Sequence, residues 1–322
     1  MTDQPASEAA DLVALDDAGF QRLYDTRIGP AFASHEAARV AGVDKFRSRM
    51  IIGFPASLIL GALAMLQFDN TGVGFAAAVV GFVITGIYAY APLSVVKGQV
   101  KLASLTALAE AMGVTFTLAA FAPPAFARYR ELGLLPGHDR SKFEDLFQGN
   151  YKRAAFDLYE AHLEQRHTDS KGRTTWTTAF RGQIVRLGFP RKFLGVTIVR
   201  RDAGILNVFG GGKNLERVGL EDPVFEKAFE VFGTDQVEAR YLLHPVFMQR
   251  LVDLETALKG KKLRCAFEQG DLLIAIEGGN LFEPGDMFKP LADPARARKI
   301  VDDIAGVLRV MDSVLTAQAA RG

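Results

Sequence analysis

Two uncharged apolar runs stand back to back near the start of the chain. The first extends from Met50 to Phe68 and the second from Gly72 to Val96, with three residues between them. A lipid hydrocarbon core about 30 Å thick is crossed by roughly 20 apolar residues of helix. Both runs reach this length, so the pattern predicts a transmembrane helical hairpin over 50–96. The alternative is a pair of buried core helices in a soluble protein, which the lack of charge in both runs disfavours.

The charges that flank the two runs predict an orientation. Six basic residues lie on the side away from the tip: Arg39, Lys45, Arg47, Arg49, Lys97 and Lys101. The tip itself, residues 69–71, contains no lysine or arginine. Because cytoplasmic loops carry an excess of basic residues, we expect both termini in the cytoplasm and the tip outside. The lone Cys265 has no partner for an internal disulfide, which agrees with a reducing cytoplasm.

Residues 1–49 have the pattern of a helical, cytosolic N-terminal arm. Apolar residues recur at helical spacing after Asp17, and Gly29-Pro30 is expected to interrupt the helix before it continues toward the first apolar run. The acidic start of the arm does not resemble a signal peptide. Its mixed charges favour packing on the main domain over binding to a lipid surface.

Alternating and β-branched positions are frequent in the cytosolic part, residues 97–322. Segments with strand character are Ala155–His167, Thr174–Leu187, Leu194–Arg200, Leu263–Glu268 and Leu272–Glu277. Short turns separate several of them, which is typical of an antiparallel meander and not of βαβ crossovers. Helices are expected over 245–260 and over 294–318, where apolar positions step by three and four. The pattern therefore predicts an α+β domain with a mainly antiparallel sheet.

Composition narrows the classes of partner. The chain of 322 residues has 38 basic and 37 acidic residues, for a formal net charge of +1. This balance argues against a nucleic-acid-binding surface. The expected partners are the lipid bilayer and either further copies of this chain or another protein.

One block of the sequence resembles a known family. The block is Leu220 to Met248, LEDPVFEKAFEVFGTDQVEARYLLHPVFM, and it resembles an uncharacterised bacterial membrane-protein family catalogued as a domain of unknown function, number three-one-three-seven. Two shorter echoes are F-x-D-x-x-x-G from Phe143, which departs from the family's acidic version, and Asn280-Leu-Phe-Glu-Pro284. The resemblance implies a helical arm, two adjacent spans in a bacterial inner membrane and a cytosolic α+β domain. It implies no activity, because the family has no established catalytic residues.

Two motifs that suggest chemistry fail on their spacing. His162 and His167 are five residues apart, whereas a helical zinc pair needs four, and on a strand they would point to opposite faces. The loop Gly210-Gly211-Gly212-Lys213-Asn214 lacks the Ser or Thr of a phosphate-binding loop, and Asn207 stands where its first glycine should be. We therefore expect exposed strand residues and a flexible hairpin loop, with no metal and no cofactor.

The densest polar cluster of the family-like block is Asp235, Glu238, Arg240 and His244. On one helix, spacings of three and four bring Asp235 toward Glu238 and Arg240 toward His244. Helix capping and salt bridges are one account of these residues, and a functional polar surface is the other. No catalytic residue can be assigned from the sequence, and any functional site is expected in this cluster.

Small residues recur at four-residue spacing within the two apolar runs. They are Ser57 and Gly61 in the first run and Ala77, Gly81 and Thr85 in the second. Such residues permit close approach of helices in a membrane. They favour packing of the two spans on each other, and self-association between protomers is the alternative.

These observations favour an integral, multi-pass inner-membrane protein that presents a cytosolic binding or scaffold domain. The alternative is a membrane-anchored enzyme with an unrecognised polar site near Asp235–His244. A non-enzymatic role is favoured because the sequence shows no nucleophile–base set, metal cluster or nucleotide loop. A channel or transporter is disfavoured because neither apolar run contains an ionisable residue.

Overall fold

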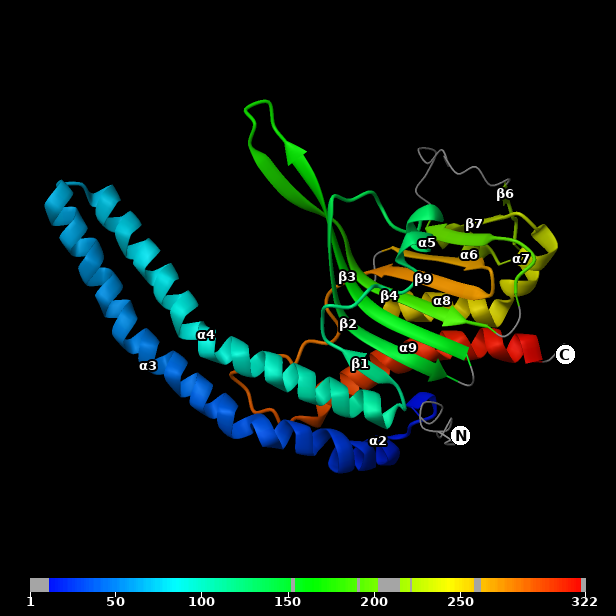
Figure 1. Ribbon diagram of the computed structural model, residues 1–322, viewed down its shortest axis with the longest axis horizontal. Coiled ribbons are helices and arrows are strands. Elements are labelled where there is room, and N and C mark those ends of the chain that lie inside the picture. The colour runs from blue at the N-terminus through cyan, green and yellow to red at the C-terminus, as the bar shows by residue number, and fades with distance from the viewer. Residues whose placement is uncertain are drawn as a thin grey trace. The chain divides into compact units, whose positions relative to one another are not determined.

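The computed structural model describes residues 12–151, 154–189, 192–201, 215–220, 222–257 and 262–319 (Figure 1). The chain divides into two compact units. The hairpin unit contains Phe20–Leu108 and Glu283–Ala297, and the sheet unit contains Met1–Gly19, Ala109–Phe282 and Arg298–Gly322. Long helices dominate the first unit, and an antiparallel sheet with flanking helices makes up the second.

The hairpin unit is built on two long antiparallel helices. The helix α2 (Asp17–Leu23) continues through a π-helical stretch, η1 (Tyr24–Ile28), into α3 (Gly29–Phe68), and α4 (Thr71–Ala111) returns. The expected interruption at Gly29-Pro30 is wrong. The proline lies in the first turn of α3, directly after the π-helical stretch, and the helical stretch from Asp17 to Phe68 continues through it.

A tight turn joins α3 to α4. Asp69 ends α3 with a left-handed φ of 45°. The side chain of Asn70 then caps α4, because its Oδ1 accepts hydrogen bonds from the N–H groups of Gly72 at 2.9 Å and Val73 at 3.3 Å. The two apolar runs consequently lie side by side along the hairpin (Figure 1).

Small residues allow α3 and α4 to approach closely. A Cβ atom on Gly61 would lie 2.7 Å from the Cβ of Ala78, and one on Gly81 would lie 3.2 Å from the side chain of Ser57. The hydroxyl groups of Ser57 and Thr85 are 3.4 Å apart. These small residues therefore serve packing within the hairpin, and self-association between protomers stays a prediction.

Much of the apolar surface of α3 and α4 is exposed. Both helical stretches, Asp17–Phe68 and Thr71–Ala111, are long and apolar enough by composition to cross a membrane. Only 11% of the most apolar window in each stretch is buried, and Leu66 and Phe75 expose 78% and 74% of their surface. A core helix of a soluble protein buries its apolar face, so this surface does not fit that alternative.

A segment from much later in the chain, Glu283–Ala297, completes the hairpin unit, and we call it the strap. At its start the Glu283 carboxylate lies 2.5 Å from Nζ of Lys97 and 3.3 Å from Nζ of Lys101 on α4. Burial alone would raise the pKa of Glu283. The hydrogen bonds and positive charges of the two lysines outweigh it, and this pKa falls to about 2.

The strap is also bonded to α3. Arg39 donates a hydrogen bond to the carbonyl oxygen of Met287 at 3.0 Å. The neighbouring Glu36 pairs with Arg39 at 2.7 Å and accepts the N–H of Leu291 at 3.0 Å. The hydrogen bond from Arg39 lowers the pKa of Glu36. The strap therefore connects the two helices just beyond the apolar runs.

The sheet unit contains nine described strands in a single sheet. They are β1 (Thr115–Thr117), β2 (Arg140–Tyr151), β3 (Ala154–Thr168), β4 (Thr174–Gly188), β5 (Thr197–Arg201), β6 (Glu216–Arg217), β7 (Phe229–Gly233), β8 (Leu263–Glu268) and β9 (Asp271–Glu277). Their order is β1-β2-β3-β4-β9-β8-β5-β7-β6, and neighbouring strands are antiparallel. The predicted antiparallel sheet is confirmed, although β1, β2, β6 and β7 lie outside the segments expected to be strands.

Helices cover both faces of this sheet. They are α5 (Phe126–Glu131), α6 (Pro223–Ala228), α7 (Gln236–Leu242), α8 (Pro245–Ala257) and α9 (Pro294–Ala319). Tyr129 of α5 packs in a core cluster that includes Ala266 of β8. The next residue, Phe267, points to the other face, where its ring centroid lies 5.3 Å from that of Phe247 on α8.

Replacing Gly61 by leucine is expected to push α3 and α4 apart, because a side chain there collides with Ala78. Overpacking of this kind costs about 1–3 kcal/mol, so denaturant titration of the detergent-solubilised chain should show a lower midpoint. The matched control is Gly86→Leu, because a Cβ at Gly86 on α4 meets nothing within 4 Å. Equal destabilisation by both substitutions would contradict the close packing.

The depressed pKa of Glu283 predicts an acid-sensitive strap. Its contribution to the free energy of unfolding is present above the unfolded pKa of roughly 4.3 and is lost as the pH falls toward about 2. Glu283→Gln should therefore lower that free energy by about 1 kcal/mol near neutral pH, and the difference from the native chain should shrink on acidification. Thermal unfolding of both chains across acidic pH measures the difference, and a constant gap would argue against the ion pair.

Candidate binding pocket

The carboxylates of Asp235 and Glu238 hold backbone in place. Asp235 is the N-cap of α7, and its Oδ1 accepts the N–H groups of Val237 and Glu238 at 2.9 Å each. Glu238 reaches the loop before β5, where its two oxygens accept the N–H groups of Leu194 at 2.7 Å and Gly195 at 2.8 Å. These contacts position α7 against the loop.

Arg240 and His244 line a pocket with a volume of about 610 Å³. Its walls come from the segment before α6, from the C-terminal part of α7 and from the start of α8: Gly219, Leu220, Asp222, Pro223, Arg240, Leu243, His244, Pro245 and Met248. This volume lies within the roughly 300–1,000 Å³ typical of small-molecule sites. The mixture of mostly apolar lining and a few polar groups is also typical of such sites.

The four residues of the predicted cluster therefore divide into two pairs. Asp235 and Glu238 stabilise the local fold, whereas Arg240 and His244 share the pocket. The ring of His244 also caps the start of α8, because its Nδ1 accepts the N–H of Phe247 at 3.4 Å. Whether the cluster is functional stays a prediction, but the structure identifies which two residues a ligand could reach.

The other sequence motifs are placed as follows. His162 on β3 lies 2.9 Å from the Thr178 hydroxyl across to β4, and His167 lies five residues further along the strand. The loop Gly210–Asn214 lies outside the described residues. Within the residues that the structure describes, no three His, Cys, Asp or Glu side chains are grouped to hold a metal ion. Cys265 is buried on β8, and burial raises the pKa of its thiol.

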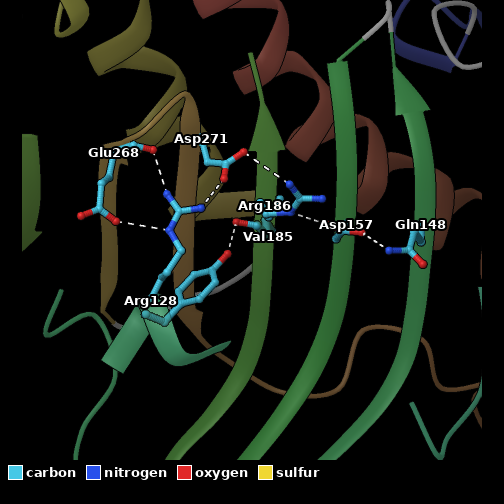
Figure 2. Close-up of polar contacts among 8 residues, drawn as sticks. Arg128, Gln148, Asp157, Val185, Arg186, Glu268 and Asp271 are labelled. Carbon is cyan, nitrogen blue, oxygen red and sulfur yellow. Dashed lines mark hydrogen bonds and ion pairs between the residues drawn. The ribbon is translucent and has the colours of Figure 1, made fainter. Parts of the chain in front are cut away.

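A polar network that the sequence analysis did not select crosses one end of the sheet (Figure 2). Arg128 of α5 is its first member. Its Nε lies 3.2 Å from Oε2 of Glu268, its Nη2 donates to the Glu268 carbonyl oxygen at 2.8 Å, and its Nη1 donates to Asp271. Arg128 thereby ties α5 to the turn between β8 and β9.

The network continues across β4, β3 and β2. Arg186 lies between two carboxylates, with its Nε 2.5 Å from Asp157 and its Nη1 3.4 Å from Asp271. The amide of Gln148 donates to the other oxygen of Asp157 at 2.7 Å. Burial would lower the pKa of Arg186, but Asp157 and Asp271 outweigh it and raise this pKa. Each of the three carboxylates is therefore paired with at least one of the two arginines, and the arrangement holds strand ends together.

This network was not found from the sequence, because its members lie far apart along the chain. In the register of the sheet, Asp157 is directly opposite Gln148 on β2 and Arg186 on β4. Along the chain, Arg186 follows Asp157 by 29 residues, and Asp271 follows Arg186 by 85. The signal was a charged residue between apolar neighbours at a strand position that is buried, and it can be recognised only once the strand pairing is known.

Comparison with known proteins identifies part of the chain. Residues 178–315 match the family model described as "Protein of unknown function (DUF3137)". The match confirms the resemblance seen in the sequence and brings no activity with it. It does not include α3 or α4, so it does not test the membrane layout.

Two further comparisons add nothing specific. No curated protein matches the chain. A crystal structure described as the mycobacterial trehalose monomycolate transport factor A, TtfA, is 13% identical with a TM-score of 0.32, and the alignment covers 64% of this chain and 93% of that chain. Similarity at this level supports no argument about function.

Replacing Arg186 by methionine is expected to destabilise the sheet unit strongly. The substitution leaves Asp157, which is 1% exposed, without its cation, and breaking a buried pair in this way costs about 3–5 kcal/mol. The control is Arg173→Met, because Arg173 pairs with Asp169 on the exposed surface, where such pairs contribute about 1 kcal/mol or less. Urea unfolding of both variants measures the difference, and similar losses would show that the network is not structural.

Proposed function

We propose that this chain is a membrane-anchored binding protein. In this proposal, α3 and α4 cross a lipid bilayer through residues 50–96, and the sheet unit is a cytosolic binding domain. The observation that carries the proposal is the exposed apolar surface of the paired helices. Soluble proteins rarely leave an apolar surface of this extent in water, whereas lipid covers it without cost.

The residues at the cytosolic end of the apolar runs support this placement. The guanidinium of Arg49 lies 4.1 Å from the ring centroid of Tyr88 and donates to the Tyr88 carbonyl oxygen at 2.7 Å. Arginine and tyrosine are typical of the membrane–water interface, where each combines an apolar stem or ring with a polar tip. Lys97 and Lys101 lie at the same end and engage Glu283 of the strap.

An anchoring role fits the spans better than a conducting role. Neither apolar run contains an Asp, Glu, Lys, Arg or His residue, and such residues typically mark ion or proton pathways through membranes. The small residues of the runs are used for contact between α3 and α4. The proposed location is a bacterial inner membrane with both termini in the cytoplasm, as the basic flanks indicate.

A membrane-anchored enzyme is the second candidate. The observation in its favour is that Arg240 and His244 line one pocket. Against it, the carboxylates of Asp235 and Glu238 already accept backbone N–H groups. The pocket therefore fits a binding protein better than an enzyme. If His244→Ala abolished a measured turnover and left the thermal stability unchanged, the enzyme would become the preferred candidate.

Cysteine labelling in intact bacterial cells tests the anchor. Thr71→Cys places a thiol at the exposed tip between α3 and α4, and Ser170→Cys places one in the exposed turn between β3 and β4. A membrane-impermeant maleimide should label the first variant in intact cells and the second only after permeabilisation. The buried Cys265 leaves the native chain as an unlabelled background.

Two results would contradict the anchor. One is labelling of both variants to the same extent in intact cells. The other is release of the chain from membranes by alkaline carbonate, which removes peripheral proteins and leaves spanning helices in place. Reversed labelling, with Ser170→Cys outside, would keep the anchor and overturn the proposed orientation.

A further inference from the structure

Arg240 holds a positive charge at the pocket wall, and no carboxylate of the described residues forms an ion pair with it. Its Nε donates to the carbonyl oxygen of Gly219 at 3.2 Å, and its Nη2 donates to Oε1 of Gln236 at 3.1 Å. Both acceptors are neutral, and no ion pair joins Arg240 to another residue in the described part of the chain. Two hydrogen bonds therefore fix the guanidinium, while its charge stays available to a ligand.

The other polar groups of the pocket do not compete for that charge. Asp222 accepts the N–H of Phe225 at 3.0 Å, so its negative charge is offset by the first amides of α6. The hydrogen bond accepted by Nδ1 of His244 places the ring proton on Nε2, so the neutral ring is a donor at that atom. Arg240 and His244 thus supply donors at the pocket, beside the Asp222 carboxylate that caps α6.

The rest of the lining is aliphatic. Leu220, Leu243 and Met248 face the pocket together with two prolines. Leu243 and Met248 are buried, and the thioether of methionine adapts to ligands of different shape. A volume of about 610 Å³ accommodates an extended hydrocarbon group as well as a charged one.

We propose that this pocket binds an anionic amphiphile, a molecule with one carboxylate or phosphate group on an aliphatic chain. Its anionic group pairs with Arg240, for which a planar fork of N–H donors is suited, and its chain lies against Leu220, Leu243 and Met248. The inference rests on the proposed binding role of the sheet unit and not on the hairpin crossing a bilayer. The ligand comes either from free fatty acids or from acidic membrane lipids.

The test measures one-to-one adducts of the full chain by native mass spectrometry in a neutral detergent. The probes are oleate and phosphatidic acid for the two sources, with oleyl alcohol and acetate as controls for charge and chain. We expect an adduct with oleate or with phosphatidic acid, at least tenfold weaker binding of oleyl alcohol, and none of acetate. The stronger of the two anionic probes identifies the source.

Substitutions in the pocket test whether the ligand binds there. Arg240→Gln should weaken binding of the anionic probe about tenfold, a loss typical of one charge-assisted contact, whereas Arg240→Lys should retain part of it. Arg250→Gln is the matched control, because Arg250 lies on α8 outside the pocket and pairs with Asp253. Leu220→Trp should fill the pocket and abolish binding, and Val246→Trp, at an exposed site of α8, should not.

Three results would overturn the proposal. They are equal binding of oleate and oleyl alcohol, unchanged binding in Arg240→Gln, and equal losses in Leu220→Trp and Val246→Trp. Thermal unfolding of each variant without ligand separates loss of the site from loss of the fold. Failure of the anchor would appear in the cysteine labelling alone, so the two proposals fail independently.

Discussion

The exposed apolar surface of α3 and α4 is the constraint on which the rest of the hairpin unit depends. Each square ångström of apolar surface left in water costs about 25 cal/mol, so these helices need a nonpolar surrounding. In lipid no hydrophobic force draws helices together, and close contact between small residues has to supply the attraction. Gly61 and Gly81 provide that contact. Polar bonding is concentrated beyond the apolar runs, where Glu283 of the strap engages Lys97 and Lys101.

One partly buried charge in each unit is compensated by two partners of opposite charge, whereas the charge of Arg240 at the pocket is not compensated in this way. Glu283 has two lysines and Arg186 has two carboxylates, so each partly buried charge is matched by more than one partner. A buried pair of this kind contributes little net stability over an apolar packing, but loss of one partner is expensive. Arg240 differs because its hydrogen-bond acceptors among the described residues are neutral oxygens. An unbalanced charge beside an apolar wall costs stability unless a ligand of opposite charge completes it.

The sequence predicted elements whose signal is local and missed those whose signal is not. The apolar runs and the strands β3, β4, β8 and β9 follow from length and alternation, and residues 178–315 match the family that the block at Leu220 resembles. The five-residue strand β7, FEVFG, was missed because its aromatic residues and valine fit a helix as well as a strand. The cluster Asp235–His244 could be selected from composition, but its division into backbone anchors and pocket residues depends on partners such as Leu194 and Gly219, which lie far away in sequence.

The position of the strap in the sequence determines the order in which the parts of the hairpin unit are synthesised. Glu283 follows Lys101, the residue it contacts on α4, by 182 positions, and the whole sheet from β1 to β9 lies in between. A ribosome therefore releases both long helices first and supplies the carboxylate for their lysines only after the last strand has been made. Until then, Lys97, Lys101 and Arg39 lack the contacts that they make with the strap. The two long helices are therefore made before the sheet, but their contacts with the strap can form only after it.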